Sequence, residues 1–186
     1  MKKIMFNDKY GLTQAVLEGR KTQTRRTFLK PGEEKLLHGI TSEYIITVRS
    51  MYKVGETIAI AQSYKDIHAE ILREVGDWDL KKEFRQSKGY TNKMFVRAEK
   101  MPHAIRITNI RVQRLQDIRE KDCMKEGIWR DENVGLEGTT YWYHGLANSS
   151  FRTPQEAYAS LIDSISGKGT WASNPYVFVY DFELIN

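Results

Sequence analysis

The segment from Gly19 to Arg26 concentrates the side chains best suited to chemistry, and it reads Gly-Arg-Lys-Thr-Gln-Thr-Arg-Arg. Arginine forms paired hydrogen bonds to phosphate oxygens, and lysine adds a compact positive charge. No acid lies within the segment to neutralise these charges. We therefore expect an RNA- or nucleotide-binding site formed by Arg20, Lys21, Thr22, Thr24, Arg25 and Arg26. The alternative is a solvated basic surface without a specific ligand.

Lys21 and Thr24 form a candidate catalytic pair within this segment. They are three residues apart, close enough for their side chains to meet on one side of a turn. A desolvated lysine near other cations loses its proton more readily, and its amine can then accept the proton of an attacking threonine hydroxyl. The residues alone leave binding and catalysis open.

Aromatic and basic residues elsewhere extend the RNA-binding hypothesis. Bases stack on exposed aromatic rings, and the candidates expected in loops or at strand ends are Tyr64, Trp142 and Trp171. Arg106 and Arg111 fall on one predicted strand, where their charges can hold a phosphate.

Metal and cofactor chemistry are not expected from this sequence. The histidines at positions 38, 68, 103 and 144 have no ligand-type spacing. The glycine-rich stretch Gly167–Thr170 lacks the preceding strand and the spacing of a phosphate-binding loop, and no dinucleotide-binding fingerprint is present. We therefore expect no metal and no cofactor.

Composition predicts one basic, soluble domain. The chain has 186 residues, 40% of them hydrophobic and 28% charged, with a formal net charge of +5. A basic balance raises the expectation of an acidic partner such as RNA or a nucleotide. Cys123 is the single cysteine, which excludes an internal disulfide and favours a reducing compartment. Because no apolar run approaches the length of a membrane span, we expect a cytoplasmic protein without a membrane partner.

The elements that would position the basic segment can be read from spacing and caps. A short strand at residues 4–6 precedes a helix whose apolar residues recur at helical spacing and which stops at Gly19. The segment therefore begins at a fixed point of the scaffold. Further strands are expected at residues 44–48, 57–61 and 104–112, the last with a β-bulge at Thr108–Asn109.

The second half of the chain carries the clearest local signals. A helix is expected from Asp117 to Gly127, and another begins at Thr153, followed by proline and a capping-box glutamate. Residues 176–184 predict a central strand because both of its faces are apolar. Residues near 63–100 and 129–150 have no clear period and are expected to be insertions in one domain that spans residues 1–186.

Four stretches, in chain order, resemble the ASCH domain, a family of the PUA-like superfamily common in bacterial and phage proteins. They are Leu17–Arg26, Tyr52–Ile60, Ile110–Ile118 followed by Glu126–Ile128, and Trp171–Val179. The resemblance implies an α+β fold with a PUA-like β-barrel of about five to six mixed strands, surrounding helices and a charged insertion. It also implies an RNA-related role in which the basic segment lines a cleft.

The resemblance further implies a possible enzymatic activity. Some small ASCH proteins are amidohydrolases that release acetate from N4-acetylcytidine with a lysine, a threonine three residues later and a glutamate on a later strand. Lys21 and Thr24 match the first two. The strand at residues 104–112 contains no acid, and the nearest candidates in sequence, Glu56, Glu70 and Glu99, do not align. A protein-interaction domain of a mobile element, with the charged insertion as its surface, is a third hypothesis.

Overall fold

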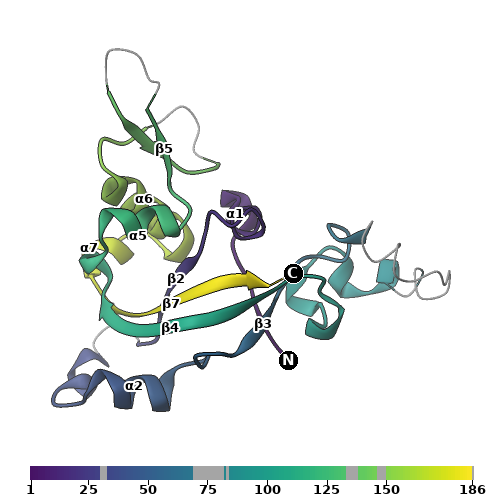
Figure 1. Ribbon diagram of the computed structural model, residues 1–186, viewed down its shortest axis with the longest axis horizontal. Helices are drawn as coiled ribbons and strands as arrows, with labels where there is room; N and C mark the ends of the chain where they lie inside the picture. The colour runs from purple at the N-terminus through teal and green to yellow at the C-terminus, as the bar shows by residue number, and fades with distance from the viewer. Residues whose placement is uncertain (30–32, 69–81, 83, 133–137, 146–149, 186) are drawn as a thin grey trace.

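In the computed structural model, five strands form one mixed sheet in the order β1-β3-β4-β7-β2 (Figure 1). The structure describes residues 1–29, 33–68, 82, 84–132, 138–145 and 150–185. The strands are β1 (Lys2–Ile4), β2 (Gln23–Thr27), β3 (Thr57–Ile60), β4 (Ala104–Arg114) and β7 (Tyr176–Ile185). Only β1 and β3 are parallel. The fold is α+β, and the described residues show no pairing between the edge strands β1 and β2 that would close a barrel.

Strands β4 and β7 form the centre of the sheet, as the sequence predicts. β7 lies between β4 and β2, and its apolar side chains are buried on both faces. The expected β-bulge in β4 is confirmed, because the register with β7 shifts between Ile107 and Asn109. Because the bulge shifts the alternation by one residue, Arg106 and Arg111 lie on the same face of β4, where they contact Glu183 and Asp181 of β7.

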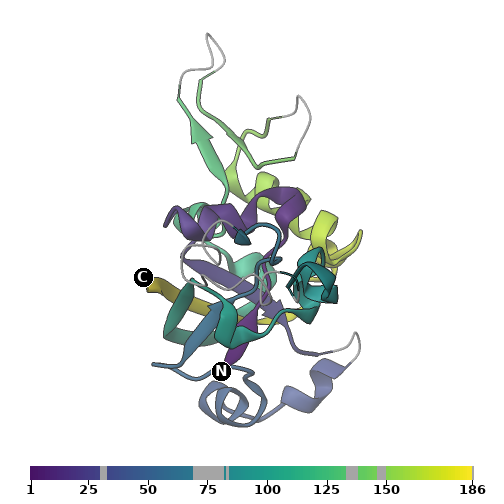
Figure 2. The ribbon, with the colours of Figure 1, turned by 90° about the vertical axis from the view of Figure 1, so that its right-hand side faces the viewer.

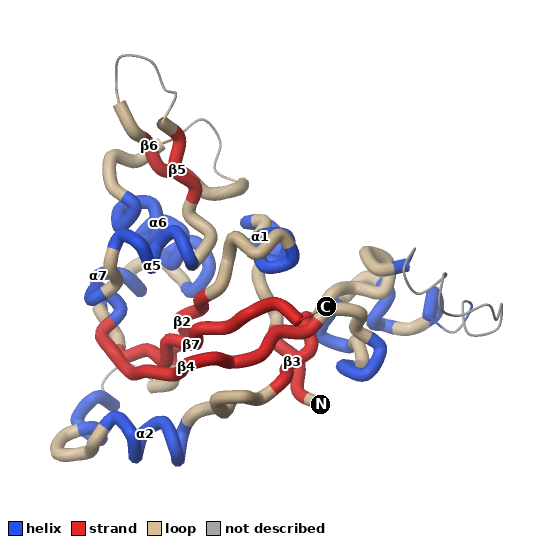
Figure 3. Tube along the Cα trace, viewed as in Figure 1, coloured by secondary structure: helices blue, strands red, loops and turns tan. Residues whose placement is uncertain are grey.

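Helices pack on both sides of the sheet. They are α1 (Leu12–Leu17), α2 (Ser42–Arg49), α5 (Glu120–Lys125), α6 (Pro154–Ser166) and α7 (Thr170–Ser173). Figures 2 and 3 place α1, α5, α6 and α7 on one side and α2 on the other. The capping box of α6 is confirmed: the Thr153 hydroxyl accepts the Glu156 amide N–H, and the Glu156 carboxylate accepts that of Thr153, both at 3.2 Å.

Three predicted elements are corrected, one in its type and two in their bounds. The strand expected at residues 44–48 is wrong, because these residues belong to helix α2. Thr41 caps the helix by accepting the Tyr44 amide N–H at 3.3 Å. Ile45 is buried, whereas Tyr44 and Val48 are 59% and 60% exposed, a helical pattern that their β-branched and aromatic composition conceals.

The helix expected from Asp117 begins later, at Glu120. Asp117 instead caps the short 3-10 turn Leu115–Asp117, where its carboxylate accepts the Arg114 N–H at 3.3 Å. The first strand lies two residues earlier than expected, at Lys2–Ile4. The helix that ends before Gly19 and the strand at 57–60 agree with the sequence.

The two regions expected to be insertions extend from the sheet in different directions (Figure 1). Described parts of residues 63–100 form a second hydrophobic cluster against strand β3, which includes Tyr64, Ile67 and Val96. Residues 69–81 and 83 of this region lie outside the described residues. Strands β5 (Trp129–Asp131) and β6 (Thr140–Trp142) form a separate hairpin. Among the helices that the structure describes, none is both long and apolar enough to cross a membrane.

Candidate functional site

A cavity of about 860 Å³ adjoins strand β2. Four residues of the basic segment line it: Lys21, Thr24, Arg25 and Arg26. The loop after β1, the end of α2, α6 and β7 supply the other walls. This volume is typical of pockets for small organic ligands, which run to roughly 300–1,000 Å³. The structure therefore brings together the candidate pair Lys21 and Thr24 on one cavity.

The floor of the cavity is a buried ionic cluster of Lys21, Arg25 and Glu126. Lys21 Nζ lies 2.5 Å from Glu126 Oε2, and Arg25 Nη1 lies 2.9 Å from Glu126 Oε1. The side chains are 2%, 0% and 5% exposed, respectively. The basic segment itself contains no acid. The carboxylate that pairs with Lys21 and Arg25 comes from Glu126, which lies 105 residues after Lys21 in the chain. This part of the segment is therefore not the solvated basic surface of the alternative hypothesis.

Three acceptors surround the ammonium of Lys21. Besides the Glu126 carboxylate, its Nζ donates to the backbone carbonyl oxygens of Gln23 at 2.8 Å and Glu126 at 3.0 Å. Burial lowers the pKa of Lys21 below its ordinary value of 10.5, whereas the charge of Glu126 and its hydrogen bond oppose this change. Because all three donors of an ammonium are used, the contacts favour the charged form.

Backbone contacts fix the position of this cluster. The Lys21 amide N–H donates to the Ala15 carbonyl at 2.8 Å, and the Thr22 amide donates to the Lys125 carbonyl at 3.0 Å. The basic segment is therefore tied at one point to helix α1 and at the next to the end of α5. Gly127 follows Glu126 with φ of +101°, which turns the chain out of α5.

Gly127→Ala is expected to destabilise the protein by about 1–3 kcal/mol, because φ of +101° is strained for any residue with a Cβ. An added Cβ would also lie 3.2 Å from Leu12 Cδ2. Urea unfolding followed by circular dichroism measures the change. Gly167→Ala is the control for backbone strain alone, because it has φ of +107° and open space at the Cβ position. A smaller loss at Gly127 than at Gly167 would contradict the packing argument.

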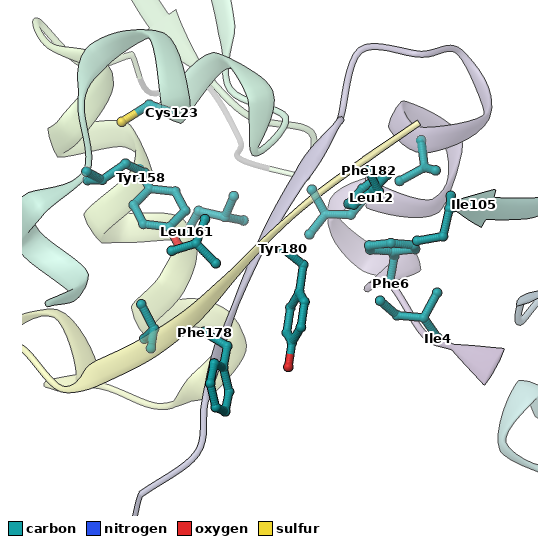
Figure 4. Close-up of a cluster of buried hydrophobic side chains, with 14 of the residues drawn as sticks. Ile4, Phe6, Leu12, Ile105, Cys123, Tyr158, Leu161, Phe178, Tyr180 and Phe182 are labelled. Carbon is teal, nitrogen blue, oxygen red and sulfur yellow. The ribbon is translucent and has the colours of Figure 1, made fainter. Parts of the chain in front are cut away.

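Aromatic and aliphatic side chains form the walls of the cavity. Phe178 and Tyr180 project from the same face of β7, and Tyr158 and Leu161 come from α6 (Figure 4). Tyr52 packs edge-on against Tyr180 with ring centroids 5.1 Å apart. Burial raises the pKa of Tyr158 well above its ordinary value of 10. Its hydroxyl has no hydrogen-bond partner within the described part of the chain.

Exposed cations lie at the rim of the cavity. Arg26 and Arg49 both line it and are exposed. Arg26 Nη2 donates to the Met5 carbonyl at 2.6 Å, and neither arginine pairs with an acid in the ranges that the structure describes. The cavity thus combines a buried polar floor, aromatic walls and a cationic rim.

Other predicted residues of the basic segment lie outside this cavity. Arg20 Nη2 pairs with Glu18 at 2.5 Å, and its guanidinium lies 3.9 Å from the centroid of Trp129. Thr22 faces a second cavity. On β4, Arg106 pairs with Glu183 at 2.8 Å, and Arg111 pairs with Asp181. The cations that were expected to bind one ligand together therefore lie at separate places in the structure.

The three aromatic residues predicted to stack on bases differ in burial and in the side chains they contact. Tyr64 is corrected: it is 3% exposed, packs against Phe84 and accepts the Arg97 amide N–H at 2.9 Å, so a base cannot reach its ring. Trp171 is partly buried against Tyr158. Trp142 is half-buried and stacks in parallel on Trp129, with ring centroids 5.2 Å apart.

Sequence reasoning missed Glu126 as a functional residue. The available signal was its place directly before Gly127, because a glycine of positive φ holds the preceding residue at a sharp helix end. The acidic partner of Lys21 and Thr24 was expected on strand β4, whereas the acid that contacts Lys21 follows helix α5. Gln23 was also missed, although its Oε1 accepts a hydrogen bond from Arg25 Nη1 at 2.5 Å.

Cys123 is fully buried beside this cluster, and burial raises the pKa of its thiol to about 12. The thiol of Cys123 therefore stays protonated in the native state. This buried, protonated thiol stabilises the fold at pH values below the unfolded pKa of about 8.5, and the stabilisation is lost as pH rises through about 12. A disulfide reagent at pH 8 is expected to leave the native protein unreacted for an hour and to titrate one thiol per chain in guanidinium. Rapid reaction of the native protein would contradict this burial.

Within the described ranges, no group of three or more histidine, cysteine, aspartate or glutamate side chains is arranged to hold a metal ion. Comparison of the chain with protein-family models, with curated proteins and with solved structures finds no match.

Proposed function

We propose that the first cavity binds a nucleobase-containing ligand, either a free nucleotide or one nucleotide unit of an RNA. The observation that carries this proposal is the joint presence of the buried Lys21–Glu126–Arg25 cluster, aromatic walls and a cationic rim around one cavity of about 860 Å³. A base has two apolar faces and polar edges, and a nucleotide adds a phosphate. Each of these parts has a complementary group in the cavity.

The base is expected to pack against the aromatic wall. Phe178 and Tyr180 offer rings from β7, and Phe28 packs on Phe178 with ring centroids 4.1 Å apart. Polar edges of the base would meet the hydroxyl of Thr24 and the carboxylate of Glu126, which are held at fixed positions by the sheet and by the ion pairs. Such preorganised polar groups reduce the ordering cost of binding.

The phosphate is expected to contact Arg26 and Arg49 at the rim, because arginine binds phosphate through paired hydrogen bonds. Calorimetric titration with cytidine 5′-monophosphate and with cytidine tests this assignment. Arg26→Gln/Arg49→Gln should weaken nucleotide binding at least tenfold and leave nucleoside binding within about twofold. Lys65→Gln/Lys168→Gln, which removes the same charge from exposed positions outside the cavity, is the control. If wild-type protein binds neither probe at millimolar concentration, the proposal fails.

We also propose that the chain is an ASCH-type domain with a PUA-like core. Supporting this proposal, the four resembling stretches fall on elements of one core: β2 after α1, β3, β4 with the following turn, and β7. Strands β3, β4, β7 and β2 are consecutive neighbours in the sheet. The barrel closure expected of that superfamily is part of this proposal.

A second candidate function is hydrolysis of an acylated nucleoside such as N4-acetylcytidine. It is favoured by one observation, the contact of the Glu126 carboxylate with Lys21 on the cavity that Thr24 also lines. Thr24 Oγ would bond to the acyl carbon as its proton passes to a neutral Lys21 amine. The C–N bond would then break, the departing amino nitrogen would take that proton, and water would hydrolyse the threonyl ester to acetate.

This mechanism requires Lys21 to lose its proton. Burial lowers the pKa of Lys21 and favours that loss, but three hydrogen-bond acceptors at Nζ favour the ammonium. For this reason, binding is the first proposal and hydrolysis the second.

Chromatography of N4-acetylcytidine after incubation with the protein tests the hydrolase hypothesis. Conversion to cytidine should fall at least a thousandfold in Thr24→Val. It should persist in Thr27→Val, a control threonine that lines the same cavity from the same strand. Turnover that survives Thr24→Val would exclude this nucleophile.

A further inference from the structure

A second cavity, of about 610 Å³, also adjoins strand β2. It shares no lining residue with the first within the described chain. Its walls come from Thr22 and Gln23, from β4, from β7 and from residues 117–125 around helix α5. Arg111, Arg119, Lys121 and Lys125 line it, and none of these four lines the first cavity.

The acids of the second cavity are committed to internal partners. Asp181 accepts hydrogen bonds from Gln23 Nε2 at 2.5 Å and Asn109 Nδ2 at 3.2 Å, and it also pairs with Arg111. Burial alone would raise the pKa of Asp181, but these hydrogen bonds and the Arg111 charge hold it below its ordinary value. Asp122 Oδ2 lies 3.7 Å from Arg111 Nη2, and Asp117 accepts the Arg114 N–H.

Three cations of this cavity have no such partner. Arg119, Lys121 and Lys125 are exposed, and no acid lies within salt-bridge distance of them in the part of the chain that the structure describes. The buried amide nitrogen of Gln113, which also lines the cavity, lacks an acceptor among the described residues. The cavity therefore presents a local surplus of positive charge and hydrogen-bond donors.

We propose that the second cavity is a phosphate-binding site. Arg119, Lys121 and Lys125 supply the charge at its rim, and the guanidinium of Arg111 is held in place at its wall by Asp181 and Asp122. A phosphate group requires several donors converging on its oxygens, which these side chains provide. The cavity is larger than one phosphate ion, so the group can belong to a small phosphate ligand or to a nucleic-acid backbone.

The stacked side chains of Arg20, Trp129 and Trp142, here called the aromatic ladder, distinguish these two sources of phosphate. The Thr22 amide N–H donates to the Lys125 carbonyl at 3.0 Å, which connects the basic segment to the rim of the second cavity. Arg20 belongs to the same segment and lies just before Thr22 in the chain. The Arg20 guanidinium covers Trp129, and Trp129 stacks on Trp142. A single-stranded RNA with its phosphates in the cavity can stack a base on this ladder, whereas a free phosphate ion does not extend to it.

Titration with inorganic pyrophosphate and with a single-stranded eight-nucleotide RNA tests the proposal. Arg119→Gln/Lys121→Gln/Lys125→Gln should weaken binding of the probe at least tenfold. For the RNA, it should also reduce the slope of log K against log salt by about 2–3, roughly one unit for each lost phosphate contact. The control Lys65→Gln/Lys100→Gln/Lys168→Gln removes three exposed charges outside the cavity and should change neither quantity.

The pattern of binding separates the outcomes. RNA binding that Trp142→Ala also weakens identifies a nucleic-acid backbone, whereas binding of pyrophosphate alone identifies a small phosphate ligand, and both support the site. Equal losses in the two triple variants, or no binding of either probe at 50 mM salt, would overturn it. Pyrophosphate has no base to pack against the aromatic walls of the first cavity, so failure of the first cavity to bind cytidine is a result separate from failure of this site to bind pyrophosphate.

Discussion

Replacing Glu126 by glutamine is expected to lower the free energy of unfolding by about 3–5 kcal/mol. The reason is that Lys21 and Arg25 are both buried and both contact this carboxylate, while the other acid near Arg25, Asp122, lies farther away at 3.9 Å. Glutamine keeps the shape but removes the charge, which leaves two cations in an environment that solvates them poorly. Folded proteins have a total stability of only about 5–15 kcal/mol, so the variant loses a large share of it.

Urea unfolding monitored by circular dichroism measures this loss at neutral pH. Glu183→Gln is the matched control, because Glu183 pairs with Arg106 at 2.8 Å but both side chains are about half exposed. An exposed pair of this kind contributes roughly 0–1 kcal/mol. The Glu126→Gln deficit should also shrink at alkaline pH, since an unpaired buried lysine can release its proton. Equal and small losses in the two variants would show that the cluster is solvated.

Replacing the whole cluster with apolar side chains is expected to separate its structural role from its binding role. In Lys21→Met/Arg25→Met/Glu126→Leu, no buried charge of the cluster remains unpaired, and such replacements are often neutral or stabilising by about 1–4 kcal/mol. Asp122 keeps its hydrogen bond from Gln23 at 3.4 Å and its contact with Arg111. The variant should therefore fold, with stability near that of the wild type.

Nucleotide binding by the same variant is expected to fall at least a hundredfold, because the cavity loses its polar floor. Calorimetry with cytidine 5′-monophosphate measures this change, which corresponds to about 2.7 kcal/mol or more. Thr24→Val is a milder companion that removes only the hydroxyl at the cavity and is expected to weaken binding by about 5–10-fold. A folded triple variant that binds as tightly as the wild type would mean that the cluster serves the fold alone.

Local signals in the sequence predicted the elements whose ends and faces are set by nearby residues. Helix α6 has its cap, proline and capping-box glutamate within four residues, and β7 is apolar on both faces over half of its length. Helix α2 was missed because its isoleucines, valine and threonine favour strands by composition, whereas the Thr41 cap and the burial of Ile45 decide for a helix.

The candidate site was predictable only in part. Lys21 and Thr24 are close in sequence and both line the first cavity, but Thr24 lies on strand β2 and not on the expected turn. Their acid, Glu126, is brought close by the packing of α5 against β2, which no local pattern encodes. For the same reason, the burial of Arg25 and the separation of Arg20, Arg106 and Arg111 from the first cavity could not be read from charge alone.

Strand β2 also has a consequence for how this protein meets other chains. It is the outer strand of the sheet, and such strands are open to pairing with strands of other molecules, which can lead to aggregation. Charged side chains directed inward, as Arg25 is here, make an outer strand a poor template for that pairing. The opposite border of the sheet, β1, is three residues long and carries Lys2 and Lys3. The charges that form the cavity floor therefore also discourage strand addition and favour solubility at high concentration.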